Sequence, residues 1–298
     1  YASAYAGAAR RGYAGQFEPN HLAVPTGVPT AATIHDLSVL DHGEWHPDDR
    51  VQWWRADLER AVAATDRWFA VSQFTRRRMI DALSLPPERI EVIPLAAREL
   101  PPPDPDRAAQ AAREAGLPGR FLLHLGTLEP RKNLATLLDA WSLLPADFRR
   151  EVRLVLAGGV GWGPGAFWSE LVHHPAAGEV MVCGYVSDAD AALLLSAALA
   201  VVVPSRYEGF GLPVLEAMNA GTPVLCSTAE ALVELSAGAA EVISPDDPDA
   251  WAPAIRRAAE DADWRERLSA AGRARAAEFS WAETARRHAE LLAKLVEA

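Results

Sequence analysis

The sequence predicts an α/β protein of two lobes, each built around a parallel β-sheet. Short apolar runs alternate with helical patterns along most of the 298 residues, which is typical of strands joined by helical crossovers. A proline-rich stretch, LPPPDPD at residues 100–106, interrupts the alternation and suits neither a helix nor a central strand. We therefore expect a first lobe over residues 1–100, a linker over 101–107, a second lobe over 108–280 and a terminal helix over 281–298.

The first lobe contains three runs with the composition of strands, at residues 30–35, 68–71 and 90–93. The residues before position 16 are mainly alanine, glycine, arginine and tyrosine, and they show no clear period. Ser72 directly follows the second run and is expected to cap the helix that begins there. With so few strand candidates, this lobe is expected to be partial.

The second lobe shows a more regular alternation and is expected to be complete. Strands are expected at residues 121–125, 153–157, 179–183, 199–203 and 223–226, and helices at 134–144, 187–197 and 213–219. After it, Ala285, Ala289, Leu292 and Leu295 recur at helical spacing. They predict an amphipathic helix that ends the chain and packs back on the first lobe.

Composition and charge exclude several classes of function. Half of the residues are hydrophobic and 23% are charged, as in soluble globular proteins. The net charge of -11 argues against a nucleic-acid-binding protein, which needs a basic face for phosphates. Cys183 and Cys226 are isolated, so neither a zinc site nor a disulfide framework is expected, and a reducing compartment fits. No apolar run is long enough to cross a bilayer, and a cytoplasmic location is expected.

One short basic run stands out in this acidic chain. Arg76, Arg77 and Arg78 follow one another on a predicted helix. Such a run can contact an anionic lipid surface, which would place the protein at the inner face of the membrane. In so acidic a chain, a solvated helix face is the favoured interpretation.

A glycine-containing turn leads from a buried apolar strand into a helix near residue 210. Gly209 and Gly211 allow the backbone to approach a ligand closely, and Pro213 stands where a helix start needs no N–H group. The N–H groups near Phe210, Gly211 and Leu212 would point at an anion, with the helix dipole behind them. The diphosphate of a nucleotide suits such a turn.

Two glutamates flank this turn. Glu216 is expected in the first turn of the helix, where its carboxylate can accept hydrogen bonds from ribose hydroxyls. Glu208 precedes the glycines and would face the group attached to the phosphate. A glycine turn with two surface carboxylates is the simpler interpretation of any one of these residues. Their joint spacing at a strand-to-helix turn favours a nucleotide site.

The spacing of Glu208 and Glu216 resembles the E-x7-E motif of the family 4 retaining glycosyltransferases (glycosyl transferases group 1) of GT-B fold. Further segments resemble the family in the same order, namely FLLHLGTLEPRKN, CGYV, AMNAGTPV and FSW. The resemblance covers roughly residues 30–290. It implies two Rossmann-like lobes whose parallel sheets face an interlobe cleft, a nucleotide diphosphate sugar as the donor substrate, and no cofactor or metal.

The segment GTLEPRKN, residues 126–133, follows a strand and precedes a helix that Asn133 is expected to cap. Taken alone, Arg131 and Lys132 would be solvated surface cations. The resemblance implies instead that they neutralise the departing diphosphate, beside Gly126 in the donor site. Many relatives carry arginine where this chain has Thr127, so one phosphate contact is expected to be absent or supplied differently.

Two further residues gain a role through the resemblance. His35 follows the first strand of the first lobe and is implied to contact the transferred sugar near its anomeric carbon, although a lone histidine is more often structural. Val186, in the turn after residue 184, is implied to flank the nucleobase, and a plain turn residue is the alternative. Family members also begin with a strand and a glycine-rich loop, which Gly12 and Gly15 match weakly. We expect residues to be missing here rather than the lobe to be reduced.

Together these features predict a retaining hexosyltransferase acting from a nucleotide diphosphate sugar to an acceptor hydroxyl. The form GTLEPRKN resembles bacterial mannosyl- and rhamnosyltransferases of polysaccharide or secondary-metabolite pathways, so a GDP-linked hexose is the leading donor. The acceptor, whether a sugar, a lipid-linked glycan or a metabolite, stays open. The alternatives are a nucleotide-sugar epimerase of the same fold and a non-catalytic nucleotide-sugar-binding protein.

Overall fold

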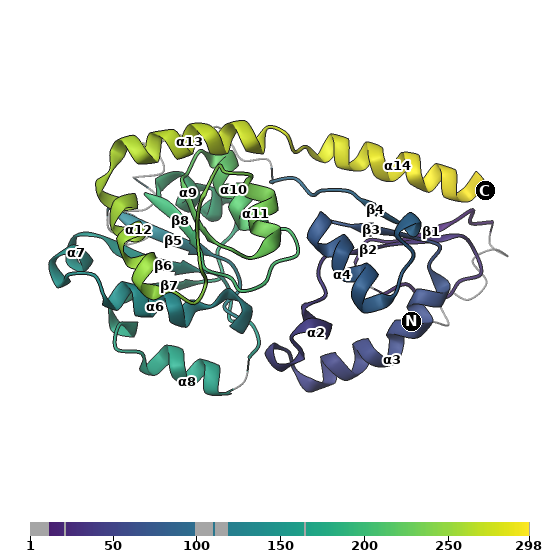
Figure 1. The fold of residues 1–298 in the computed structure, drawn as a ribbon, viewed down its shortest axis with the longest axis horizontal. Coiled ribbons are helices and arrows are strands. Elements are labelled where there is room, and N and C mark those ends of the chain that lie inside the picture. Colours follow the sequence, from purple (N-terminus) through teal and green to yellow (C-terminus); the bar gives the residue numbers. More distant parts are fainter. Residues whose placement is uncertain (1–11, 21, 99–109, 111–118, 164, 298) are drawn as a thin grey trace. The chain divides into compact units, whose positions relative to one another are not determined.

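The computed structural model describes residues 12–20, 22–98, 110, 119–163 and 165–297. The chain divides into two compact units, one made of Tyr1–Ala96 with Phe279–Ala298 and the other of Ala97–Glu278 (Figure 1). Each unit contains one parallel sheet, so the predicted α/β class with two sheets is confirmed. The predicted linker at 101–107 lies outside the described residues.

The sheet of the first unit has four parallel strands in the order β1-β2-β3-β4. The strands are β1 (Gln16–Glu18), β2 (Thr30–Ile34), β3 (Arg67–Ala70) and β4 (Ile90–Val92). The three predicted runs are confirmed to within a residue or two at their ends. β1 escaped prediction because it is a three-residue edge strand without a buried residue, so it carries no apolar pattern.

Helices cover both faces of this sheet (Figure 1). They are α2 (Ser38–Asp41), α3 (Asp48–Ala64), α4 (Gln73–Leu83) and α14 (Trp281–Glu297). Alternate strand residues point to opposite faces, so one face packs on α3 and α4 through Trp54 and Met79. Leu291 and Leu292 of α14 pack on the other face, against Phe69. Ser72 accepts a hydrogen bond from the N–H of Thr75, which confirms the predicted cap of α4.

The basic run on α4 is engaged within its own unit. Arg76 donates to the carbonyl of Pro87 at 3.0 Å, and Arg78 donates to Asp41 Oδ1 at 2.7 Å. These contacts favour a structural role over lipid binding. In the part of the chain that the structure describes, no helix has the length and apolar character required to span a bilayer.

The sheet of the second unit has six parallel strands in the order β10-β9-β8-β5-β6-β7. The strands are β5 (Phe121–Leu125), β6 (Arg153–Ala157), β7 (Val180–Gly184), β8 (Ala200–Val203), β9 (Val224–Ser227) and β10 (Glu241–Ile243). All five predicted runs are confirmed. β10 was missed because it has three residues at the edge of the sheet, and one of them is buried.

This sheet is covered by helices on both faces. They are α6 (Leu134–Ser142), α7 (Ala146–Glu151), α8 (Gly165–His173), α9 (Asp188–Ala197), α10 (Leu212–Ala220), α11 (Glu230–Ser236), α12 (Pro248–Glu260) and α13 (Ala262–Ala276). α6 and α12 share one core with the sheet, and α9 and α10 lie on the opposite face (Figure 1). Because β5 and β8 are neighbouring parallel strands, the segments that follow them meet at one edge of the sheet.

Candidate nucleotide site of the second unit

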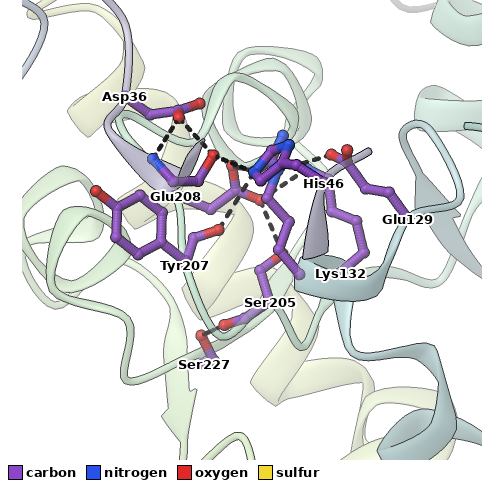
Figure 2. Close-up of polar contacts among 10 residues, drawn as sticks. Asp36, His46, Glu129, Lys132, Ser205, Tyr207, Glu208 and Ser227 are labelled. Atoms are coloured by element: carbon purple, nitrogen blue, oxygen red, sulfur yellow. Dashed lines mark hydrogen bonds and ion pairs between the residues drawn. The ribbon is translucent and has the colours of Figure 1, made fainter. Parts of the chain in front are cut away.

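The segments after β5 and β8 bring three predicted residues into direct contact. Glu208 Oε2 lies 2.6 Å from Arg131 Nη1, and Glu208 Oε1 lies 2.7 Å from Lys132 Nζ. Figure 2 shows Lys132 and Glu208 directed toward each other from the two segments. Residues that are 76 positions apart or more thus form one cluster. Sequence spacing alone does not show this contact.

Two further polar residues complete the cluster. Ser205 donates its hydroxyl to Glu208 Oε1 at 2.8 Å, and Glu129 Oε1 lies 2.7 Å from Arg131 Nε. The side chains of Glu208 and Lys132 are 6% and 5% exposed, so this ion pair is buried. Lys132 is therefore not the solvated surface cation that its sequence neighbourhood, taken alone, suggests. Two carboxylates balance two cations here, which satisfies the rule that buried charges are paired.

The cluster shifts the pKa values of its members. Burial alone would raise the pKa of Glu208, but Arg131 and Lys132 outweigh it and lower this pKa to about 2. Burial and the neighbouring Arg131 lower the pKa of Lys132. Glu208 is therefore a carboxylate at neutral pH. An ammonium has three N–H donors, so the bond from Lys132 to Glu208 is compatible with a further bond to a phosphate oxygen.

A histidine that was not predicted from the sequence lies close to this cluster. His124 is fully buried in β5, and its Nδ1–H donates to the carbonyl of Val202 at 3.0 Å. Nε2 has no hydrogen-bond partner, and burial followed by the charge of Lys132 lowers the pKa of His124 to about 4. The imidazole is therefore neutral in the folded protein. His124 could have been noticed in the sequence because it is the one polar residue of an otherwise apolar strand.

We expect His124 to make the second unit sensitive to mild acid. Its folded pKa of about 4 is below the ordinary 6.5, so the unfolded chain takes up the proton first. The free energy of unfolding is therefore highest above pH 6.5 and decreases as the pH falls from 6.5 toward 4. Between pH 7 and pH 5 the loss should be about 2 kcal/mol. Urea unfolding at both pH values should show a smaller loss for His124→Asn, which keeps a donor for Val202. An equal loss in both proteins would exclude His124 as the cause.

The segment after β5 turns sharply through left-handed backbone. Gly126 has φ +148 and Asn133 has φ 56. Asn133 occupies the predicted N-cap position of α6 but makes no capping bond to the helix backbone, because its Oδ1 accepts from the Thr136 hydroxyl at 3.0 Å. Its amide donates to the carbonyls of Pro204 and Pro245 at 3.1 and 2.6 Å. Asn133 thereby ties this segment to the one that follows β8. A Cβ at Gly126 would lie 3.7 Å from Lys132 Nζ, so Gly126 backbone lines the cluster.

The start of α10 explains why residue 211 is glycine. Gly211 is the N-cap at φ +102, and a Cβ there would lie 2.5 Å from Leu232 Cδ2. Positive φ and this close packing therefore require glycine even without a ligand. Leu212 is the first helical residue, and a helix start leaves such N–H groups without an intrahelical acceptor. Gly209 and Phe210 lie in the turn that precedes it.

Alanine at position 211 is expected to destabilise the second unit by about 3 kcal/mol, because strained backbone adds to an overlap with Leu232. Gly238 is a matched control, since it has φ +88 but no atom within 4 Å of an added Cβ. Gly238→Ala should cost only the backbone term, about 1 kcal/mol. Thermal unfolding of both variants gives the comparison. Equal losses would show that the contact with Leu232 contributes nothing.

Glu216 lies one residue further into α10 than predicted, because the helix begins at Leu212 and not at residue 213. Glu216 is therefore in the second turn, and the helix dipole favours its charge less than expected. The residue as a whole is 5% exposed, and its Oε1 accepts a hydrogen bond from Arg98 Nε at 2.6 Å. Arg98 was not predicted, because it lies 118 positions away in sequence.

The two remaining predicted residues lie outside the cluster. Val186 is half-buried between β7 and α9, directly before Ser187, which caps α9. His35 directly follows β2 in the first unit, and its Nε2–H donates to the carbonyl of Pro19 at 2.9 Å. Their proposed contacts with the nucleobase and the sugar stay predictions. Among the residues with described positions, no group of three acidic, histidine or cysteine side chains is arranged to hold a metal ion.

The family follows from comparison with known proteins. Residues 107–275 match the family described as Glycosyl transferases group 1, and residues 13–97 match Glycosyltransferase Family 4. The first of these matches covers more than half of the chain and includes the whole cluster. The chain belongs to the glycosyl transferases group 1 family.

Several family members with assigned names are similar to this chain. O-antigen chain mannosyltransferase B of Escherichia coli is 37% identical over 84% of this chain and 66% of its own length. Serotype-specific mannosyltransferase WbdA of E. coli is 30% identical over 90% of this chain and 34% of its own length. The D-inositol 3-phosphate glycosyltransferase of Frankia alni is 32% identical over 87% and 67%. The chain thus spans less than two thirds of the first two.

Solved structures support the fold. Anabaena Alr3699/HepE in complex with UDP and glucose has a TM-score of 0.75 at 22% identity, over 89% of this chain and 72% of that chain. WaaG, a glycosyltransferase involved in lipopolysaccharide biosynthesis, has a TM-score of 0.73 at 19% identity, over 92% and 76%. The predicted GT-B fold is confirmed.

Proposed function

We propose that this chain carries the activity of a retaining hexosyltransferase that uses a nucleotide diphosphate sugar. The observation that carries the proposal is the buried contact of Glu208 with Arg131 and Lys132 beside the start of α10. Two cations and the N–H group of a helix start at one edge of a parallel sheet suit a diphosphate. The mannosyltransferase relatives, 37% and 30% identical, support transfer of a hexose.

Each part of the donor has a candidate partner in the second unit. Lys132 and Arg131 would bind the diphosphate, and Glu216 would accept hydrogen bonds from the ribose. Val186 would lie beside the base. Glu208 would face the sugar. His35, which belongs to the first unit, stays a separate candidate for contact with a transferred sugar.

In the proposed reaction the bond between the anomeric carbon and the β-phosphate oxygen breaks. The acceptor oxygen forms its bond to the same face of that carbon, and the acceptor proton passes to the departing phosphate oxygen. Negative charge grows on the diphosphate as the bond breaks. Cations that are already in place stabilise this charge with little reorganisation. Lys132 and Arg131 would lower the activation barrier in this way.

GDP-mannose is the first donor to test, because named relatives are mannosyltransferases and the leading donor from sequence is a GDP-linked hexose. The acceptor is proposed to be a sugar hydroxyl of a growing polysaccharide, by similarity to the O-antigen enzyme. Solved neighbours hold UDP or UDP-glucose, so the uridine nucleotides belong in the same panel.

The test is a thermal-shift panel with GDP, UDP, ADP and dTDP, followed by donor turnover with the nucleotide that binds. A bound nucleotide raises the melting temperature according to its affinity and concentration. We expect a shift with GDP and release of GDP from GDP-mannose when an oligosaccharide acceptor is added. Conversion of the donor to another sugar without an acceptor would instead indicate an epimerase. Binding without any turnover would indicate a non-catalytic binding protein.

A further inference from the structure

Arg98 joins two parts of the candidate nucleoside site within the second unit. Its Nε donates to Glu216 Oε1 at 2.6 Å, and its Nη1 donates to Asp188 Oδ1. Asp188 is the first residue of α9 and lies two positions after Val186. One guanidinium therefore connects the carboxylate proposed for the ribose with the helix that follows the turn proposed for the base.

This arrangement holds Glu216 in one orientation. The side chain of Glu216 is 7% exposed, and a carboxylate that leaves water is costly without a partner. The guanidinium is planar and is held at a second point by Asp188, so it restricts the rotation of the carboxylate it pairs with. A carboxylate offers about four acceptor positions, and the bond from Arg98 uses one of them on Oε1. Oε2 keeps its acceptor positions for hydroxyl groups.

We propose that Arg98 is a positioning residue of the donor site, which orients Glu216 to accept hydrogen bonds from the two ribose hydroxyls. The inference rests on the proposed function, because it requires a nucleotide ribose at Glu216. Arg98 acts through Glu216 and does not touch the reacting atoms. Its loss should therefore weaken recognition of the ribose hydroxyls and leave the chemical step unchanged.

The test measures calorimetric affinity for GDP and for 2′,3′-dideoxy-GDP, which lacks both hydroxyls. Arg98→Gln should weaken GDP binding about tenfold, equivalent to about 1.4 kcal/mol, and leave dideoxy-GDP binding unchanged. The preference for GDP over the dideoxy analogue should then nearly disappear. A general loss of structure would weaken both ligands alike. In turnover assays the donor KM should rise about tenfold with kcat unchanged.

Four further variants sharpen the result. Arg98→Lys keeps the charge but cannot bridge two carboxylates through a rigid fork, so about a threefold loss is expected. Glu216→Gln should remove the same preference, and adding Arg98→Gln to it should cause no further loss, because the two residues act as a unit. Arg256→Gln is the matched control, since Arg256 forms an exposed pair with Glu260 on α12. It should leave both affinities unchanged.

The outcomes separate this inference from the function on which it rests. Tighter GDP binding by Arg98→Gln would show that Arg98 competes with the ribose, and it would overturn the inference. Unchanged GDP binding by Arg98→Gln, together with a loss in Glu216→Gln, would overturn the inference but keep the donor site. Failure of the wild-type protein to bind any of the diphosphates in the panel would overturn both.

Discussion

Replacing Lys132 with methionine is expected to lower the rate of donor turnover by about 10²–10³-fold, the usual cost of removing one group that stabilises developing charge. Methionine keeps much of the apolar stem and removes the ammonium. Lys132 Nζ is buried 2.7 Å from Glu208, so its charge acts in a poorly screened environment. Initial rates of GDP release from GDP-mannose with an acceptor give the measurement.

Lys294 provides a matched control, because it is the other lysine of the sequence and is exposed on α14. Lys294→Met should turn over the donor at the wild-type rate. Circular dichroism should show that Lys132→Met is folded, although loss of one partner of a buried pair is expected to cost about 3 kcal/mol of stability. Turnover within threefold of wild type in folded Lys132→Met would remove Lys132 from leaving-group stabilisation.

Glu208→Gln is expected to separate turnover from binding. Glutamine has nearly the same shape but no charge, so Arg131 and Lys132 lose the carboxylate that neutralises them. The diphosphate should then bind at least as tightly as in wild type, since the competing anion is gone. Turnover should fall by about 10²-fold, because the carboxylate proposed to face the sugar is missing. GDP affinity by calorimetry and kcat from initial rates test the two halves.

Glu260→Gln is the control for this variant, because Glu260 forms an exposed pair with Arg256 on α12, and such pairs contribute little. Neither GDP affinity nor turnover should change in it. Wild-type turnover in Glu208→Gln would exclude Glu208 from the mechanism. A large loss of GDP affinity would instead show that Glu208 holds the nucleotide, directly or through the fold.

The parts of the fold that position the site were predictable from local patterns. β5 and β8 are continuous buried runs, and the segments after them carry turn residues at recognisable offsets. Parallel neighbours place these segments at one edge, so a shared site for Lys132 and Glu208 follows from topology. The three-residue strands β1 and β10 were missed because they are too short to show alternation.

The errors in the site have physical causes. Asn133 adopts left-handed backbone, and its side chain is used to join two segments, so a capping rule based on residue type fails there. Glu216 was predicted in the first turn of a helix starting at residue 213, but α10 begins one residue earlier, at Leu212, which moves Glu216 into the second turn. Arg98 and His124 depend on contacts across 118 and 78 positions, which no local spacing encodes.

We propose that a nucleoside diphosphate binds in the second unit between the segments that follow β5 and β8. Hydrogen–deuterium exchange of the whole chain with and without saturating GDP tests it most directly. We expect slower amide exchange in two separate stretches, residues 126–133 and 208–216, when GDP is added. GDP that binds and slows exchange elsewhere, with both stretches unchanged, would contradict it.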